Sequence, residues 1–130
     1  MPLYQGGAVS SKVEQYKLSL NSTKERLSQI EDEVKEEYEE NLALFDSSVK
    51  SFKLYKEALN SAREYLYSVE KSFNAGLKSK LDLDDAKSRL YEVKYRFIEN
   101  IYDLANSYIN LLITTNSLEN LKLVDRVLNR

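Results

Sequence analysis

The chain contains no cysteine and no histidine among its 130 residues. Without cysteine there is no disulfide framework, no thiol nucleophile and no thiolate metal site. Without histidine the commonest general base and metal ligand is missing. We therefore expect a protein that is not an enzyme and that holds neither a metal nor another cofactor.

Residues that break helices are scarce, with one proline and three glycines in the whole chain. Two of the glycines are Gly6 and Gly7, the third is Gly76, and neither residue type occurs between Ala8 and Ala75. Charged residues make up 31% and hydrophobic residues 42%. This composition suits amphipathic helices but is thin for a thick globular core, so we expect residues 1–130 to form a single structural unit.

Long apolar runs and an excess of one charge are also missing. No stretch of about 18 apolar residues exists, and the first residues lack the charged start and apolar centre of a signal peptide. The net charge of −2 offers no electrostatic footprint for nucleic acid. The sequence predicts a soluble piece with no nucleic-acid partner.

What the sequence does contain is helical periodicity. Apolar or small residues follow one another in steps of three and four, which is typical of helices packed lengthwise. The first series is Val9, Val13, Tyr16, Leu20, Thr23, Leu27, Ile30 and Val34. Two successive steps of four at Val34, Tyr38 and Leu42 indicate a stutter. The series then resumes as Phe45, Val49, Phe52, Tyr55, Leu59, Ala62, Leu66, Val69 and Phe73, so we predict a long helix over about residues 8–73.

The segment after this helix predicts a hairpin tip at residues 74–79. Gly76 is suited to the left-handed conformation that ends a helix. Ser79 is a good N-cap, and Asp82 three residues later completes a capping box. We predict a return helix over about residues 80–116, a break at Asn116 and Ser117, and a short helix over about residues 118–128. Residues 2–7 are predicted to be the end of an extended strand. The fold class is therefore an all-α, long antiparallel coiled-coil hairpin with a short C-terminal helix.

The return helix carries two apolar stripes. The first is Leu83, Ala86, Leu90, Val93, Phe97, Ile101, Leu104, Tyr108 and Leu111. The second is Tyr91, Tyr95, Ile98, Tyr102, Ala105, Ile109 and Leu112. One partner helix covers only one stripe, so the other indicates an interface. Two arrangements provide it: a three-helix bundle in which the first helix folds back near Asn41 or residues 46–48, or a closed ring of helices from several chains.

Two motifs in order resemble one protein family. The first is Leu3-Tyr4-Gln5-Gly6-Gly7 at the start of the long helix. The second combines an aromatic residue, a glycine, a basic residue, a hydroxyl and two aspartates, here Phe73, Gly76, Lys78, Ser79, Asp82, Asp85, Ala86 and Leu90. Together with Tyr91-Glu92-Val93-Lys94, they resemble the second repeat of TolC-type outer-membrane factors over nearly the whole chain.

The resemblance implies a periplasmic hairpin from a larger outer-membrane channel of a Gram-negative cell. Members of the family are homotrimers that form the exit duct of tripartite efflux pumps and type I secretion systems, exporting drugs or proteins. They contact a periplasmic adaptor (membrane fusion) protein directly and an inner-membrane transporter indirectly. The barrel strands, the first repeat and the export signal of such a channel are not in this chain, so we expect it to be a soluble periplasmic piece.

The resemblance also assigns roles to the tip. Asp82 and Asp85 match acidic positions that line the entrance as rings of carboxylates. The alternative is that both only stabilise a helix N-terminus. Lys78 matches a basic position that holds the entrance shut, and it is equally explained as a solvated loop lysine. Phe73 matches a position more often occupied by tyrosine, whose hydroxyl joins the contacts that close the entrance. Phenylalanine cannot donate that hydrogen bond. Gly76, Leu77 and Ser79 match the surface that meets the adaptor.

A structural coiled-coil or filament protein with no transport role, or an adaptor protein, is the alternative function. It explains the heptads, but it does not explain the Gly6-Gly7 start of the helix or the carboxylates at the tip.

Overall fold

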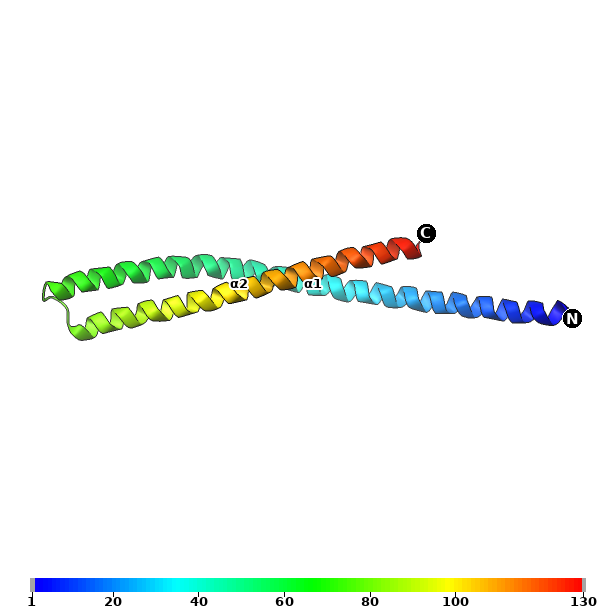
Figure 1. Ribbon diagram of the computed structural model, residues 1–130, viewed down its shortest axis with the longest axis horizontal. Coiled ribbons are helices and arrows are strands. Elements are labelled where there is room, and N and C mark those ends of the chain that lie inside the picture. The colour runs from blue at the N-terminus through cyan, green and yellow to red at the C-terminus, as the bar shows by residue number, and fades with distance from the viewer. Residues whose placement is uncertain (1, 130) are drawn as a thin grey trace. The chain divides into compact units, whose positions relative to one another are not determined.

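The computed structural model of the protein describes residues 2–129 and consists of two helices (Figure 1). Helix α1 spans Pro2–Asn74, and helix α2 spans Lys80–Leu128. Residues 75–79 form the turn between them, and the described residues contain no strand. The prediction of an all-α fold with two long helices packed against each other is confirmed.

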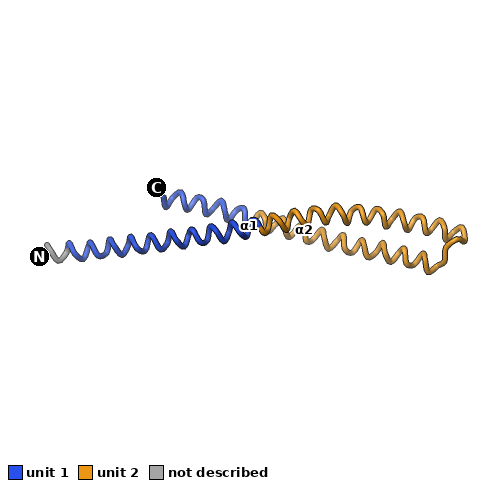
Figure 2. The backbone as a smooth tube through the Cα atoms, turned by 180° about the vertical axis from the view of Figure 1, so that it is seen from behind, with its two compact units in different colours: residues 1–39, 113–130 blue, residues 40–112 orange. Residues whose placement is uncertain are grey.

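The chain divides into two compact units (Figure 2). Unit 2 comprises residues 40–112 and contains the turn with the adjoining parts of both helices. Unit 1 comprises residues 1–39 and 113–130. Neither described helix contains an apolar stretch of the length that crossing a bilayer requires.

In unit 2, α1 and α2 run antiparallel and pack along one continuous line of side chains, which we call the seam. Its members are buried or half-buried and alternate in steps of three and four along each helix. Two ring contacts join the helices, Phe45 with Tyr108 at 5.8 Å and Phe52 with Phe97 at 5.3 Å between centroids. The seam residues of α1 are Asn41, Phe45, Ser48, Phe52, Tyr55, Leu59, Ala62, Leu66 and Val69. Those of α2 are Ala86, Leu90, Val93, Phe97, Asn100, Leu104, Ser107 and Leu111.

The chemistry of the seam changes along unit 2. The buried hydrophobic residues of the described chain, Leu59, Val69, Ala86 and Leu90, all lie in the part nearer the turn. Farther from the turn, Asn100 and Ser107 are buried with exposed fractions of 6% and 9%. The seam is therefore apolar next to the turn and partly polar beyond Phe97.

This seam corrects the stripes that the sequence predicts. Ile101 and Tyr108 were expected to face α1, but they are 42% and 50% exposed, and the preceding residues Asn100 and Ser107 are buried instead. On α1 the stutter through Leu42 is wrong, because Asn41 lies in the seam and the heptad continues unbroken. An unbroken heptad keeps both helices in one supercoil, which outweighs the better hydrophobicity of the neighbouring positions.

In unit 1, the end of α2 covers only a short part of α1. Leu27 and Val34 of α1 are half-buried, as are Leu121 and Leu128 of α2. All residues from 6 to 26 are exposed, including the predicted stripe members Val9, Val13, Tyr16 and Leu20.

Two further predictions about helix bounds were wrong. The strand-like start is absent, because α1 begins at Pro2, and proline is favoured in the first turn of a helix. Of the two arrangements left open for the second stripe, the fold-back is not adopted, because α1 continues without a break through Asn41 and residues 46–48.

The break at Asn116 and Ser117 is likewise absent, because α2 is continuous to Leu128. The Ser117 hydroxyl donates to the Ile113 carbonyl at 3.0 Å, so that polar group is satisfied inside the helix. Asparagine and serine each destabilise a helix interior by only a few tenths of a kcal/mol to about 0.7 kcal/mol relative to alanine, which is too little to end a helix.

Candidate functional site: the hairpin tip

The tip begins where α1 ends, at a Schellman motif centred on Gly76. Gly76 has a φ of +76°, as predicted for a left-handed terminating residue. Its backbone N–H donates to the Phe73 carbonyl at 2.9 Å, and the Leu77 N–H donates to the Ser72 carbonyl at 2.8 Å. These two bonds satisfy carbonyls that the end of a helix leaves without partners.

The tip ends at a capping box that starts α2. The Asp82 N–H donates to Ser79 Oγ at 3.2 Å, and the Ser79 N–H donates to Asp82 Oδ2 at 2.9 Å. The Ser79 hydroxyl also donates to Asp82 Oδ2 at 2.8 Å. The predicted capping box is therefore present, and both residues are held by reciprocal bonds three residues apart.

The same bonds set the electrostatics of Asp82. The backbone N–H and the hydroxyl of Ser79 stabilise the ionised carboxylate and lower the pKa of Asp82, and the positive charge of Lys78 adds to the effect. In this chain Asp82 is thus an ionised cap whose side chain remains in solvent.

Asp85 lies one turn farther along α2 and has a different partner. Its Oδ2 atom lies 3.1 Å from Arg89 Nε, in an exposed pair between residues i and i+4. The Arg89 guanidinium also lies over the Tyr65 ring, 5.7 Å from its centroid. Arg89 and Tyr65 were not among the predicted site residues. The four-residue spacing from Asp85 was the available signal for Arg89, whereas Tyr65 is brought near only by the pairing of the helices.

The remaining predicted residues lie on the exposed part of the tip. Leu77 is 80% exposed, Lys78 is exposed, and Phe73 in the last turn of α1 is 36% exposed. Leu81 is 78% exposed and was missed. Its exposure was predictable, because Leu81 lies outside the stripe that runs through Leu83 and Ala86. Two leucines in water within five residues make the tip partly apolar as well as charged.

A shallow groove of about 380 Å³ lies beside the tip-proximal seam. Its arginines are both paired, Arg89 with Asp85 and Arg96 with Glu92, the latter at 2.9 Å. The Glu92 carboxylate raises the pKa of Arg96, and Tyr55 adds a smaller effect in the same direction. The groove thus presents ion pairs and not bare positive charge. Its lining is Ser61, Ala62, Tyr65, Arg89, Glu92, Val93 and Arg96.

The second stripe of α2 is not covered by α1, as predicted. Its large members are all at least half exposed, and the hydroxyl of Tyr95 interacts with Glu99, which raises the pKa of the tyrosine. We call these residues the outer face of α2. They are Tyr91, Tyr95, Ile98, Tyr102, Ile109 and Leu112, with exposed fractions of 67%, 63%, 53%, 68%, 51% and 50%.

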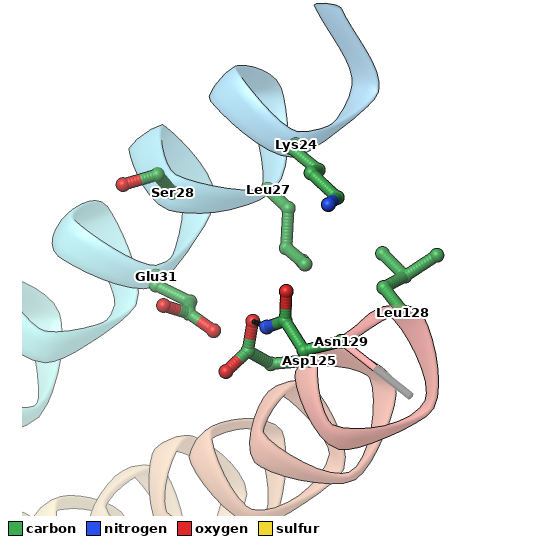
Figure 3. A pocket seen from close by; sticks show the side chains of 7 residues that line it. All are labelled: Lys24, Leu27, Ser28, Glu31, Asp125, Leu128 and Asn129. Atoms are coloured by element: carbon green, nitrogen blue, oxygen red, sulfur yellow. Dashed lines mark hydrogen bonds between the residues drawn. The ribbon is translucent and has the colours of Figure 1, made fainter. Parts of the chain in front are cut away.

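Unit 1 contains a smaller pocket of about 150 Å³ (Figure 3). Leu27 of α1 points toward Asp125 and Asn129 of α2, and Asn129 Nδ2 donates to Asp125 Oδ1 at 2.7 Å. The described residues contain no cluster of three or more acidic side chains that could hold a metal ion.

Comparison with known proteins shows which family the sequence matches. The sequence model of the outer membrane efflux protein family matches residues 1–117. The chain is 30% identical over 113 residues to the outer membrane protein TolC of Escherichia coli (strain K12), covering 87% of this chain and 22% of that protein. It is 28% identical over 111 residues to the outer membrane protein TolC of Salmonella enteritidis, covering 85% of this chain and 23% of that protein. The chain thus spans less than a quarter of the length of either relative, and no solved structure matches it.

Proposed function

Because the chain belongs to the outer membrane efflux protein family, we propose that it is the periplasmic hairpin of an outer-membrane channel. In this proposal α1 and α2 form part of the wall of a tunnel. The tunnel conducts drugs or proteins out of the cell as the exit duct of a tripartite efflux pump or a type I secretion system.

The observation that carries the proposal is the outer face of α2. Six large apolar or aromatic side chains on one helix are exposed by 50% or more, although α1 already covers another side of the same helix. A continuous apolar surface of this kind favours contact with further helices. A wall in which each helix has neighbours on both sides supplies that contact, and a homotrimer of the full-length protein would close the wall into a tube.

The tip supports the assignment of an entrance. The bonds from Ser79 lower the pKa of Asp82, and Asp85 is exposed near it along α2. Repeated by symmetry around a narrow bore, these carboxylates would attract cations and repel anions. Lys78 and Phe73 would border this ring, and the phenylalanine would supply an apolar contact in place of a hydroxyl.

The apolar part of the tip supports the assignment of an adaptor contact. Leu77 is 80% exposed. It lies between Gly76, whose N–H donates to the Phe73 carbonyl, and Ser79, whose N–H donates to the Asp82 carboxylate. A rigid turn that presents a leucine to water is suited to insertion into a partner's groove. The proposed partner is a periplasmic adaptor protein, through which the channel reaches an inner-membrane transporter.

The experiment is a single-channel recording of the full-length protein carrying Asp82→Asn and Asp85→Asn. Asparagine still accepts the capping bonds from Ser79, so we expect normal folding together with reduced cation preference and loss of block by multivalent cations. Asp84→Asn removes one carboxylate at a neighbouring exposed position, so it is the control for each of the two changes made singly and should have a smaller effect than either.

Unchanged selectivity in the double variant would leave Asp82 and Asp85 with their structural roles only. A purely structural coiled coil predicts a further result, namely that the full-length protein forms no conducting channel at all.

A further inference from the structure

Every asparagine and serine in the seam of unit 2 is followed directly by a large apolar residue outside it. The pairs are Asn41-Leu42, Ser48-Val49, Asn100-Ile101 and Ser107-Tyr108. In each pair the first residue is buried or half-buried, and in three pairs the second is exposed by 37% to 50%. This part of the hairpin, residues 41–52 and 97–111, therefore carries a second, more apolar line of side chains. Each of its members that replaces a polar seam residue lies one position after that residue.

The two apolar lines lie on the same side of the hairpin. Both helices are right-handed and run antiparallel, so the residue that follows a seam position is displaced toward the same side on α1 and on α2. The contact of the Tyr108 ring with Phe45 at 5.8 Å agrees with this placement. Leu42 and Val49 could thus meet Ile101 and Tyr108 if both helices turned about their axes by about 50°, half the angular step between consecutive residues.

Two physical preferences compete in this section. The polar seam continues the heptad of the apolar part next to the turn, so no stutter is required. The apolar line interrupts the heptad in each helix, with two successive steps of three at Val49, Phe52 and Tyr55 in α1 and two of four at Val93, Phe97 and Ile101 in α2. In return it buries four larger apolar side chains in place of two asparagines and two serines.

The polar seam also leaves one group unsatisfied. Asn100 Oδ1 is buried and has no hydrogen-bond partner, which is unfavourable for an amide oxygen. Turning Asn100 outward would return that oxygen to water.

We propose that residues 41–52 and 97–111 pair through either of these two seams and exchange between them by rotation of the helices. Phe45, Phe52, Phe97, Leu104 and Leu111 remain inside in both arrangements, while each polar–apolar pair exchanges its buried member. The exchange changes the surface offered to neighbours, because Ile101 and Tyr108 are available only in the polar seam. A second copy of the chain that covers these two residues would hold the polar seam by population shift.

Single cysteines test the exchange cleanly because the chain has none of its own. Ser107→Cys probes a residue that leaves the seam, and Leu104→Cys probes a neighbour that stays inside in both arrangements. Ala105→Cys, at an exposed position of the same turn, gives the unprotected rate. Alkylation by iodoacetamide is followed at several protein concentrations, so that protection by self-association is recognised by its concentration dependence.

The static structure and the proposal predict opposite orders of reaction. By exposure alone the thiol of Leu104→Cys should react faster than that of Ser107→Cys, since Leu104 is half-buried and Ser107 is buried. With exchange, the thiol at position 107 should react faster than the one at position 104, at about 0.1–10% of the rate at position 105, the range expected for a minor state. Fraying of the helices would expose positions 104 and 107 equally. Equal rates, or a slower rate at position 107, would overturn the proposal.

Ser48→Asp provides a second arm when it is combined with the single cysteines. A carboxylate at position 48 is unfavourable inside the polar seam and should shift the population toward the apolar seam. The thiol of Ser107→Cys should then react faster and that of Ile101→Cys more slowly. The variant should stay helical by circular dichroism. Loss of helix together with a reactive thiol in Leu104→Cys would show that no second seam exists and would also overturn the proposal.

Discussion

At the scale of single residues, the tip is built from bonds between residues three to five positions apart. The left-handed φ of Gly76 and the capping box of Ser79 and Asp82 follow from the identities of these residues, because each bond closes within the turn. This local character is the reason that both features were predictable from sequence.

Replacement of Gly76 by alanine should destabilise the chain by roughly 1–2 kcal/mol, the cost of a left-handed conformation for a residue with a Cβ atom. No atom beyond the two adjacent residues would lie within 4 Å of a Cβ at this position, so the cost is one of backbone conformation alone. Thermal unfolding followed by circular dichroism measures it.

Gly7→Ala is the matched control for Gly76→Ala. Gly7 lies inside α1 and is equally open, so alanine should leave the thermal midpoint unchanged or raise it slightly through helix propensity. Equal loss of stability in both variants would show that the conformation of Gly76 is not the cause.

Replacement of Ser79 by alanine should shift the pH dependence of the tip. Because the folded chain lowers the pKa of Asp82, its contribution to stability is fully present above about pH 4, the ordinary pKa of aspartate, and is lost as the pH falls through the lowered value. Ser79→Ala removes the hydroxyl bond and should move that pKa back up, besides weakening the cap by about 0.5–2 kcal/mol. An NMR titration of the Asp82 carboxylate measures the shift.

Ser88→Ala, at an exposed serine farther along α2, is the control for the titration. The Asp82 pKa should be the same in this variant as in the unmodified chain. A titration of Asp82 that does not respond to Ser79→Ala would contradict the role of the capping box.

At the scale of the helices, the decisive feature is which side of α2 faces α1. The seam buries Asn100 and Ser107, and the outer face leaves Ile98 and Tyr102 in water. The more apolar side of this section of the helix is therefore available to other helices.

The double change Ile98→Glu and Tyr102→Glu should abolish self-association of the chain while leaving the hairpin helical. Both side chains are more than half exposed and lie outside the seam, so their loss does not remove contacts with α1. Sedimentation velocity together with circular dichroism measures the two properties.

Two exposed polar positions of α2 provide the control, with Ser88→Glu and Asn106→Glu adding the same charge. This control should associate like the unmodified chain. If both double variants behave alike, added charge and not the outer face controls association.

At the scale of the whole chain, contacts are concentrated in unit 2. All four buried hydrophobic residues belong to it, whereas every residue from 6 to 26 in unit 1 is exposed. Stability should therefore vary strongly along the sequence, with the highest hydrogen-exchange protection around residues 59–90.

Removal of residues 1–26 should leave the thermal midpoint of unfolding unchanged within error, because the removed side chains from residue 6 onward bury little surface. Removal of residues 113–130 instead deletes half-buried side chains such as Leu118 and Leu121 and should reduce the helicity of the remaining chain. A large drop in the midpoint after the first truncation would show that the start of α1 is covered in solution.

The features that depend on near neighbours in the chain were predictable without the structure. The absence of proline and glycine between Ala8 and Ala75 predicted the long helix, and residues 76–82 predicted the turn. The two stripes of α2 predicted that one helix face stays uncovered, and the tip motif predicted the family that the comparison shows.

The choice between the two adjacent lines for the seam became known only from the packing of the helices. Asn100 and Ile101 differ by one position, and hydrophobicity favours the isoleucine, yet the asparagine is buried. The choice depends on the phase of the heptad along both helices at once, a non-local constraint that no short window of sequence contains. The continuation of α2 past Asn116 is likewise a result of packing. Pairing with α1 before and after this point stabilises the helix by more than the small cost of the poor helix formers Asn116 and Ser117.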